Sequence, residues 1–491
     1  MRWEFNLVFN TKKTIMKNHV QQLKIHFFKD KKMNLSYNFI SLSVFCLLIY
    51  GCDSFVEVDL PTSQLTGNTI FDDKNTANAA LANIYAQIRD NGLMTGKSNG
   101  ISNLLGNYSD ELTFYGTDAN SAKDFYNNAI IPSNTTVTGW WNNSYKQIYA
   151  TNAIIEGVSN TTKLAESDKN QLLGEALFTR ALLHFYLVNL FDNIPYITTT
   201  SYQTNAVASR KPVPEVYADI ITDLQKAIPL LSDNYISSGR VRPNNSTANA
   251  LLARVYLYSN HWDAAEQTAT LVIKNTNLYP LENNIDKVFL KESNSTIWQL
   301  MPSTAGKNTD EGTVFIFNSG PPTIVALNND LVTAFTIDDL RRTHWIKAIT
   351  SGVSTWYHAS KYKQRIPSGT SLEYSIVLRI EEQYLIRAEA RAHLNKLTEA
   401  KEDLNKIRNR SGLENTTAIT TSEILEDILG ERKLEFFTEQ GHRFFDLKRT
   451  GNLDNILSGK KSGWNTTDRL FPIPDSELRV NPNLLPQNEG Y

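Results

Sequence analysis

The 491-residue chain contains little cysteine and no marked excess of either charge. Its 49 basic and 51 acidic residues nearly balance, which argues against the basic surface that nucleic-acid binding requires. Its apolar run from Phe39 to Tyr50 is about a dozen residues long, well below the ~20 that a membrane-spanning helix needs. The run instead fits the hydrophobic core of a signal peptide.

Recognisable catalytic and metal-binding motifs are also missing. The eight histidines are scattered, and no His-Glu-x-x-His, Gly-x-Ser-x-Gly or EF-hand loop occurs. Gly92–Ser98 imitates a phosphate-binding loop but is one residue short and follows a predicted helix. The paired carboxylates Glu381-Glu382 and Asp338-Asp339 are interpreted as solvated helix faces rather than a glycosidase acid/base pair. We therefore predict no cofactor and no catalytic or metal-ligating residues, and whether a structural metal is bound stays open.

Ile49-Tyr50-Gly51-Cys52 closes the apolar run and resembles the lipobox of bacterial lipoprotein precursors. Cleavage before Cys52 would remove Cys46 and leave Cys52 as the single, lipid-modified thiol, so no disulfide could form in the mature chain. The alternative is a buried N-terminal helix or strand with two ordinary thiols. Translation could start at Met1, Met16 or Met33, and Met16 keeps a basic segment before the apolar run.

The mature part divides into regions of different character. Residues 1–51 are the expected precursor segment, and 52–75 a lipidated tether. A single domain over 76–491 then comprises an N-terminal helical part (about 76–275), a loop-rich part (about 276–372 together with 92–136) and a C-terminal helical part (about 373–491). Helical spacing of apolar residues predicts helices at 76–89, 172–190 and 214–231. Residues 92–136 show no sustained period, and 296–300 and 313–317 look like strands.

Two helical hairpins repeat at an offset of 135 residues. Residues 250–258 and 262–274 form the first, and 384–394 and 398–409 the second. Ala253 matches Ala388, and Ala265 matches Ala400. Small residues at these positions let antiparallel helices approach closely, as in tetratricopeptide-type arrays. Two unrelated hairpins that share alanine by chance are the alternative.

The C-terminal region carries further structural signals. A capping box, Thr420-x-x-Glu423, predicts a helix that runs to Gln440, with Gly441 as its C-cap. A charged cluster is interpreted as a structural network between two consecutive helices; its members are Glu431, Arg432, Glu435, Arg443 and Asp446. The last residues, from Phe471, have no period and must lie against another element to be ordered.

Several segments in the same order resemble one family. They are Gly174–Pro195, Leu378–Ala390, Glu431–Phe437, Gly441–Gly451, Phe471–Pro474 and Asn483–Tyr491. Together with the lipobox they are similar to the RagB/SusD family of outer-membrane nutrient-binding lipoproteins. The resemblance implies a mostly α, tetratricopeptide-like helical-hairpin superhelix with a loop-rich face and a few short strands. It also implies a non-catalytic lipoprotein of the cell outer membrane, anchored through Cys52 and facing outwards, with a SusC-like TonB-dependent β-barrel transporter as partner.

The family resemblance places the ligand in the irregular regions. An oligosaccharide site needs exposed aromatic rings with polar side chains at their edges. In the family, stacking aromatics follow an Asp-Glu step, which corresponds here to Asp110-Glu111, and a second ligand loop corresponds to 315–323. The expected ligand-binding residues are Tyr108, Phe114, Tyr115, Asp118, Asn120, Phe317, Asn318 and Trp356. Trp140, Trp141, Trp262 and Trp298 are expected in the core.

The most favoured function is capture of an oligosaccharide and its delivery to the transporter. A peptide ligand, as in the RagB branch, is the main alternative. A lipid-anchored hydrolase would need two carboxylates converging in one cleft, and a scaffold without a small ligand is the remaining possibility.

Overall fold

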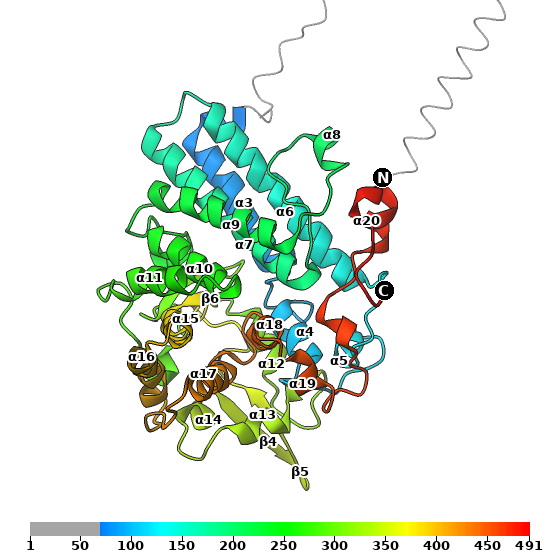
Figure 1. Cartoon of the computed structure of the whole chain (residues 1–491), viewed down its shortest axis with the longest axis vertical. Coiled ribbons are helices and arrows are strands. Elements are labelled where there is room, and N and C mark those ends of the chain that lie inside the picture. Colours follow the sequence, from blue (N-terminus) through cyan, green and yellow to red (C-terminus); the bar gives the residue numbers. More distant parts are fainter. Residues whose placement is uncertain (1–68) are drawn as a thin grey trace, which may run out of the picture. The chain divides into compact units, whose positions relative to one another are not determined.

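Helices make up most of residues 69–491, the part of the chain that the computed structural model describes (Figure 1). The fold class predicted from the sequence, mostly α with a few short strands, is confirmed. The lipobox, Cys52 and residues 52–68 of the predicted tether lie outside the described residues. Thr69–Asp72 form a short 3-10 helix, η1, in which Phe71 is buried. The packed body therefore includes the end of the segment predicted to be a tether.

The longer helices are those expected to form the body. They are α3 (Lys74–Asn91), α6 (Thr135–Asn160), α7 (Glu166–Phe191), α9 (Val213–Ala227), α10 (Asn245–Tyr258), α11 (Trp262–Ile273), α15 (Ile380–His393), α16 (Leu397–Arg410) and α17 (Thr421–Phe436). The shorter ones are α4 (Ile101–Tyr108), α5 (Ala122–Tyr126), α8 (Tyr202–Asn205), α12 (Asp310–Phe315), α13 (Asn329–Ala334), α14 (Leu340–His344), α18 (His442–Arg449), α19 (Leu453–Leu457) and α20 (Asp475–Val480). Five further 3-10 turns are η2 (Ile228–Leu230), η3 (Ser238–Arg240), η4 (Ile285–Lys287), η5 (Thr466–Arg469) and η6 (Pro482–Leu484).

The long helices pack in chain order. Helix α7 lies between α6 and α9, α10 contacts α9 and α11, and α11 packs against α15, which in turn contacts α16 and α17. The alanines predicted at the crossing points, Ala253, Ala265, Ala388 and Ala400, are all fully buried. The small side chain of alanine lets the helices approach closely at these points, so the stacked-hairpin prediction is confirmed.

The turns of the two hairpins are also equivalent. Asn260 and Asn395, 135 residues apart, both adopt left-handed backbone angles, with φ of 59° and 60°. In each turn the next residue donates its backbone N–H to a carbonyl five residues earlier, His261 to Tyr256 and Lys396 to Arg391. Asparagine tolerates this conformation better than most residues. The repeat therefore extends to the turn geometry.

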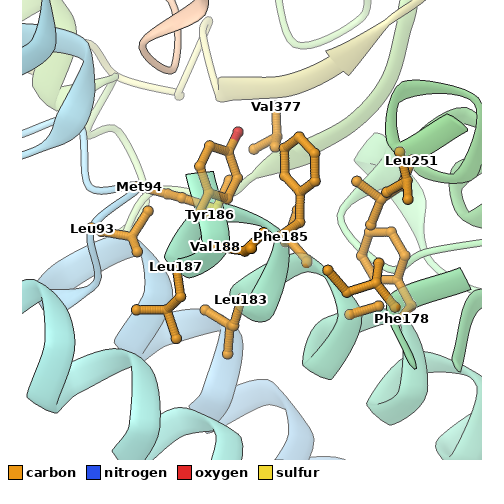
Figure 2. Packing of buried hydrophobic residues seen from close by; sticks show 14 of the residues in the cluster. Leu93, Met94, Phe178, Leu183, Phe185, Tyr186, Leu187, Val188, Leu251 and Val377 are labelled. Carbon is orange, nitrogen blue, oxygen red and sulfur yellow. The ribbon is translucent and has the colours of Figure 1, made fainter. Parts of the chain in front are cut away.

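Helix α7 is the centre of the main hydrophobic core. From Leu172 onward nearly every side chain is buried, so the helix is surrounded by other elements on all sides. Figure 2 shows Phe178, Phe185 and Tyr186 of α7 next to Leu251 of α10 and Val377 of the strand before α15. A helix that is buried all round needs apolar residues on every face.

In the described part of the chain, six short strands form three antiparallel pairs. The strands are β1 (Leu112–Phe114), β2 (Thr296–Leu300), β3 (Val325–Leu327), β4 (Ile346–Ser351), β5 (Ser354–Ala359) and β6 (Ser375–Arg379), paired as β1–β3, β2–β6 and β4–β5. Within residues 69–491, no helix has the length and apolar character needed to cross a membrane.

Residues 92–136 were predicted to be a long, partly ordered loop region, and loops and turns do make up much of the segment. The segment contains α4, β1 and α5, and every residue of α4 is buried. Full burial removes the contrast between an apolar and a polar face, and this contrast is the signal that periodicity detects. The sequence of α4 also contains buried polar residues: Ser102 accepts the N–H of the distant Gln440, and the amides of Asn103 and Asn107 donate to the nearby carbonyls of Ser98 and Asn103.

Two boundary predictions also need correction. Residues 313–317 are not a strand, because α12 covers Asp310–Phe315 and is capped by the Thr309 side chain, which accepts the N–H of Gly312. The capping box at Thr420 is confirmed, but α17 ends at Phe436 rather than Gln440. Gly441, with φ of 74°, stands at the start of α18 instead of closing α17.

The C-terminal segment lies against the end of α7, as its lack of period required. Phe471 donates its backbone N–H to the Leu190 carbonyl, and the Asn488 amide donates to the carbonyls of Phe191 and Phe471. The segment is not fully extended, since α20 forms within it. These contacts join the last residues of the chain to the central helix.

Candidate ligand-binding face

Strand pairing brings the two predicted ligand regions together, although they are about 200 residues apart in the sequence. Phe114 of β1 faces Val325 of β3, and the Tyr115 N–H donates to the Ile324 carbonyl at 2.7 Å. Strand β5 of the β4–β5 hairpin packs against β3. We call the surface formed by β1, β3, the β4–β5 hairpin and the loops 115–121 and 316–323 the ribbon face. Figure 1 shows the β4–β5 hairpin protruding from the helical body.

The first loop of the ribbon face presents one exposed ring. The Tyr115 side chain is 41% exposed, whereas Phe114 is half-buried and packs near Tyr126, with ring centroids 6.3 Å apart. Asp118 is exposed and pairs with Lys123 at 2.7 Å, and the hydrogen bond from Lys123 lowers the pKa of Asp118. Asn120 accepts the N–H of Ala122 through its side-chain oxygen and so starts α5. Tyr115 and the Asp118–Lys123 pair are thus accessible to a ligand, while Phe114 and Asn120 contribute to the structure of the loop.

The second loop rests on the indole of Trp356. A Cβ atom added to Gly320 would lie 2.3 Å from that ring, so only glycine allows the backbone to pass so close. Phe317 meets His358 edge to face, with ring centroids 5.1 Å apart, and both Phe317 and Trp356 are half-buried. Asn318 is exposed at the rim. Phe317 and Gly320 of this loop therefore both lie against side chains of β5, those of His358 and Trp356.

The Asp-Glu step beneath the first loop fixes the ribbon face to the body. Asp110 accepts two hydrogen bonds from the Arg443 guanidinium, at 2.7 and 2.9 Å, and both groups are buried. The Glu111 carboxylate accepts the Thr438 N–H, and burial, with the nearby charge of Asp110, raises the pKa of Glu111 to about 8. This step is structural support for the aromatics that follow it.

The prediction that Tyr108 contacts the ligand was wrong. Its side chain has no exposed surface, and its hydroxyl donates to the Asp468 carbonyl at 2.9 Å. Its ring is surrounded by aromatic side chains, those of Phe125, Phe444, Trp464 and Phe471. Because α4 is buried on all sides, its tyrosine is part of the core.

Other side chains also differ from their predicted environments. Trp140, Trp141 and Trp298 are buried as expected, but Trp262 is half-buried and borders a groove. The carboxylates Glu381 and Glu382 are not solvated. Glu382 is bound by Arg254 at 2.6 Å, and Glu381 by Arg379 and Arg410 at 3.2 and 3.3 Å. The sequence of α15 does not reveal this burial, because the arginines that neutralise the two carboxylates belong to other elements: Arg254 to α10, Arg379 to β6 and Arg410 to α16.

The charged cluster in the C-terminal region is structural, as expected, but it reaches well beyond two helices. Arg432 binds Asp446 within the pair α17–α18, at 2.8 Å. Glu435 instead binds three arginines from outside both helices, Arg341, Arg379 and Arg410, at 2.5–3.0 Å. Burial alone would raise the pKa of Glu435, but these three charges outweigh burial and hold that pKa below its usual range.

Two grooves lie away from the ribbon face, and none of the predicted ligand residues lines them. One, of about 350 Å³, runs between α6 and the C-terminal segment and includes Trp141, Tyr145 and Tyr149. The other, of about 720 Å³, is bordered by α15, α17, α18, α19 and the α10–α11 turn. One signal for the larger groove was visible in the sequence, the tryptophan at the start of α11, Trp262.

Comparison with known families gives two matches. Residues 56–257 match a SusD-like model described as "Starch-binding associating with outer membrane", and residues 340–491 match a model of the SusD family. The two segments together span more than half of the chain.

Individual relatives agree with this result. SusD-like protein P2 of Formosa agariphila is 27% identical over 514 residues, with 92% of this chain and 99% of that protein covered. SusD-like protein P25 of the same organism is 23% identical with the same coverage. Two solved structures share the fold at 24% identity and a TM-score of 0.73. They are a SusD superfamily protein of Parabacteroides distasonis (87% of this chain, 100% of that one) and a laminarin-binding SusD-like protein (85% and 99%).

Proposed function

The chain belongs to the SusD/RagB family, and from this premise we propose that it captures an oligosaccharide on its ribbon face and does not transform it. We further propose that it is held at the outer membrane by lipid on Cys52 and passes its ligand to a SusC-like TonB-dependent transporter. The ligand and the partner are inferred from the family, and the geometry of the ribbon face supports the proposed position of the site.

One observation carries the proposed binding site. The ribbon face joins an exposed ring, Tyr115, and a half-buried ring, Trp356, with the exposed polar side chains Asp118 and Asn318. Sugar rings offer apolar C–H faces and a rim of hydroxyl groups, which aromatic faces and polar edges complement. The laminarin-binding relative, whose structure shares this fold, supports a glucan as the first ligand to test.

The buried carboxylates support a role in binding without catalysis. Glu381, Glu382 and Asp339 are each held by a buried arginine. A glycosidase needs two carboxyl groups that flank the scissile bond, with access to the substrate. Incubating the protein with laminarin and starch oligosaccharides and separating the products would reveal any cleavage, and cleavage would refute this part of the proposal.

The ligand-binding test uses two exposed tyrosines. Tyr115→Ala removes the ring on the ribbon face, and Tyr202→Ala removes a 78% exposed ring on α8 as a matched control. We expect Tyr115→Ala to weaken binding of laminarihexaose about tenfold, equivalent to ~1.4 kcal/mol, and Tyr202→Ala to leave it unchanged. Isothermal titration calorimetry measures both. Equal affinities of the two variants would remove the ribbon face from the proposal.

A screen of ligand classes distinguishes the remaining alternative. A glycan array and a peptide library are probed with the wild-type protein and with Tyr115→Ala. Glycan signals that fall in the variant support oligosaccharide capture. Peptide signals with no glycan signal would replace the oligosaccharide by a peptide.

Anchoring and partnership need separate experiments. Mass spectrometry of the N-terminal peptide from cells should show lipid on Cys52, and Cys52→Ala should release the protein from the membrane fraction. Affinity purification of the intact lipoprotein from detergent-solubilised outer membranes should recover a TonB-dependent transporter. Recovery of the protein alone under conditions that preserve other membrane complexes would argue against the partner.

A further inference from the structure

The groove of about 720 Å³ is larger than the other described groove and lies apart from the ribbon face. Helix α17 forms one wall, α18 and α19 form the second, and the end of α15 with the α10–α11 turn forms the third. Its volume is within the ~300–1,000 Å³ typical of sites for small ligands. Nothing in the proposed function of the ribbon face uses this groove.

A pair of stacked rings borders the groove. Trp262 of α11 and His393 of α15 lie nearly parallel, with an angle of 11° between the rings and 3.8 Å between their centroids. His393 is exposed and Trp262 is half-buried. Two helices that are far apart in the sequence thus form a flat aromatic surface at the groove, and we call this Trp262–His393 pair the plate. A flat aromatic surface can stack on the apolar face of a sugar ring.

Polar side chains line the same groove as this pair of rings. Within residues 69–491, no hydrogen bond engages the side chains of Asn260, Ser422 or Glu426, all of which line the groove. The Lys433 amine is also at the groove, and its nearest carboxylate oxygen, on Asp110, lies 4.0 Å away. These four side chains offer both donors and acceptors to a ligand rich in hydroxyl groups.

The α17 wall contains a glycine that the fold itself does not require. Gly430 lies within α17, and a Cβ atom added there would meet no other atom within 4 Å. Glycine inside a helix is unfavourable relative to alanine, because it loses more conformational freedom on folding. Its lack of a side chain leaves this part of the groove open.

We propose that this groove is a second oligosaccharide-binding site, with the Trp262–His393 pair as its stacking platform. The inference rests on the proposed function in one respect, that the ligand class is an oligosaccharide. Two sites on one protein raise the effective concentration of a long glycan at each site, so a polymer binds more tightly than a short fragment of it. A polypeptide is the competing occupant, because Leu425, Leu429 and Leu447 also line the groove.

The test fills the groove without disturbing the core. Gly430→Trp places a large side chain in the open space, and His393→Ala removes the exposed half of the plate. Gly139→Trp is the matched control, because Gly139 also lies within a helix, α6, has no atom within 4 Å of an added Cβ, and does not line the groove. Circular dichroism should show the same helical content in all three variants.

Each variant is combined with Tyr115→Ala and Asn318→Ala. These two substitutions remove exposed side chains of the ribbon face and so should weaken glycan binding there. Binding of laminarihexaose and maltohexaose is measured by calorimetry, and a glycan array extends the range of ligands. We expect the glycan binding that remains in this background to fall at least about tenfold with Gly430→Trp or His393→Ala. Gly139→Trp should leave it unchanged.

The other outcomes overturn the inference in distinguishable ways. Glycan binding could be lost with the ribbon-face substitutions alone, or the binding that remains could be unchanged by Gly430→Trp and His393→Ala. In either case the groove is not a glycan site and the proposed function stands. If the wild-type protein binds no glycan, both proposals fail. Peptide-library binding that Gly430→Trp abolishes would assign the groove to a polypeptide instead.

Discussion

Aromatic side chains have opposite environments in the helical body and on the ribbon face. In the body, Tyr108 and Trp298 have no exposed surface, and their polar atoms donate to the carbonyls of Asp468 and Val241. On the ribbon face, Tyr115 is 41% exposed and no hydrogen bond within residues 69–491 engages its hydroxyl. The difference shows that residue type alone does not identify a ligand contact, because the same tyrosine chemistry stabilises the core seven residues earlier in the chain.

Charged side chains differ between the two regions in the same way. The body contains fully buried pairs, such as Arg254–Glu382 at 2.6 Å, whereas the Asp118–Lys123 pair of the ribbon face is exposed to solvent. Breaking a buried pair leaves an unpaired charge in a medium that solvates it poorly, while an exposed charge is solvated by water. Substitutions in the body should therefore affect stability, and those on the ribbon face should affect binding.

The largest expected effect follows from removing Glu435. Glu435→Ala leaves the guanidinium groups of Arg341, Arg379 and Arg410 without their shared carboxylate. The free energy of unfolding should fall by ~3–5 kcal/mol, measured by urea denaturation. Asp219→Ala is the control, because the Lys211–Asp219 pair is partly exposed and should contribute less than ~1 kcal/mol. Equal losses in both variants would contradict the distinction between body and surface.

The second prediction concerns Glu111, which joins the two regions. Its pKa is about 8 in the folded protein against an ordinary 4.5, so the folded state retains the proton as pH rises. The contribution of Glu111 to stability is therefore fully present below pH 4.5 and is lost as the pH rises through about 8, at no more than ~1.4 kcal/mol per pH unit.

Glu111→Gln should flatten this part of the dependence of stability on pH, and denaturation at several pH values from 5 to 8 measures it. The exposed Glu399→Gln provides the reference. Identical slopes in wild type and Glu111→Gln would show that Glu111 does not take up a proton on folding.

A third prediction compares two tyrosines directly. Tyr108→Phe removes the donor to the buried Asp468 carbonyl and should cost ~1–3 kcal/mol of unfolding free energy. Tyr115→Phe removes an exposed hydroxyl and should change stability by less than ~0.5 kcal/mol. Thermal denaturation of both variants checks this. A larger loss for Tyr115→Phe would reverse the assignment of the two rings.

The smallest effects are expected at the turns of the repeated hairpins. Asn260→Ala and Asn395→Ala each place alanine at a left-handed backbone position and should cost roughly 1 kcal/mol. Asn→Gly at the same positions should cost less, since glycine adopts this conformation readily. Urea denaturation of the four variants tests whether the two turns respond alike, and a large difference between them would limit the repeat to its helices.

The sequence predicted the helical body well because its signals are local. The spacing of apolar residues indicated the hairpins, the Thr420–Glu423 capping box set the start of α17, and matched alanines predicted where helices cross. Each signal depends on residues within a few turns of one helix. Where burial is complete, as in α4, the local contrast disappears, and the sequence did not predict the helix.

The candidate site was only partly predictable. The family resemblance selected loops that the structure does bring together, but it could not separate exposed Tyr115 from buried Tyr108. Trp262 was expected in the core, although it stacks on His393 at a groove. Both errors concern which side of a ring is covered, and residues that cover these rings, such as Phe444 for Tyr108 and His393 for Trp262, are more than 100 positions away in the sequence.

By itself, the sequence determined the mostly helical fold class, the hairpin repeat and the helix ends that are capped by nearby side chains. The tertiary structure alone decided which rings are exposed, which arginine neutralises which buried carboxylate, and where the grooves lie. The physical reason is distance along the chain. Helix formation depends on residues three or four positions apart, whereas burial and ion pairing depend on contacts such as Tyr108 with Asp468, which only folding brings together.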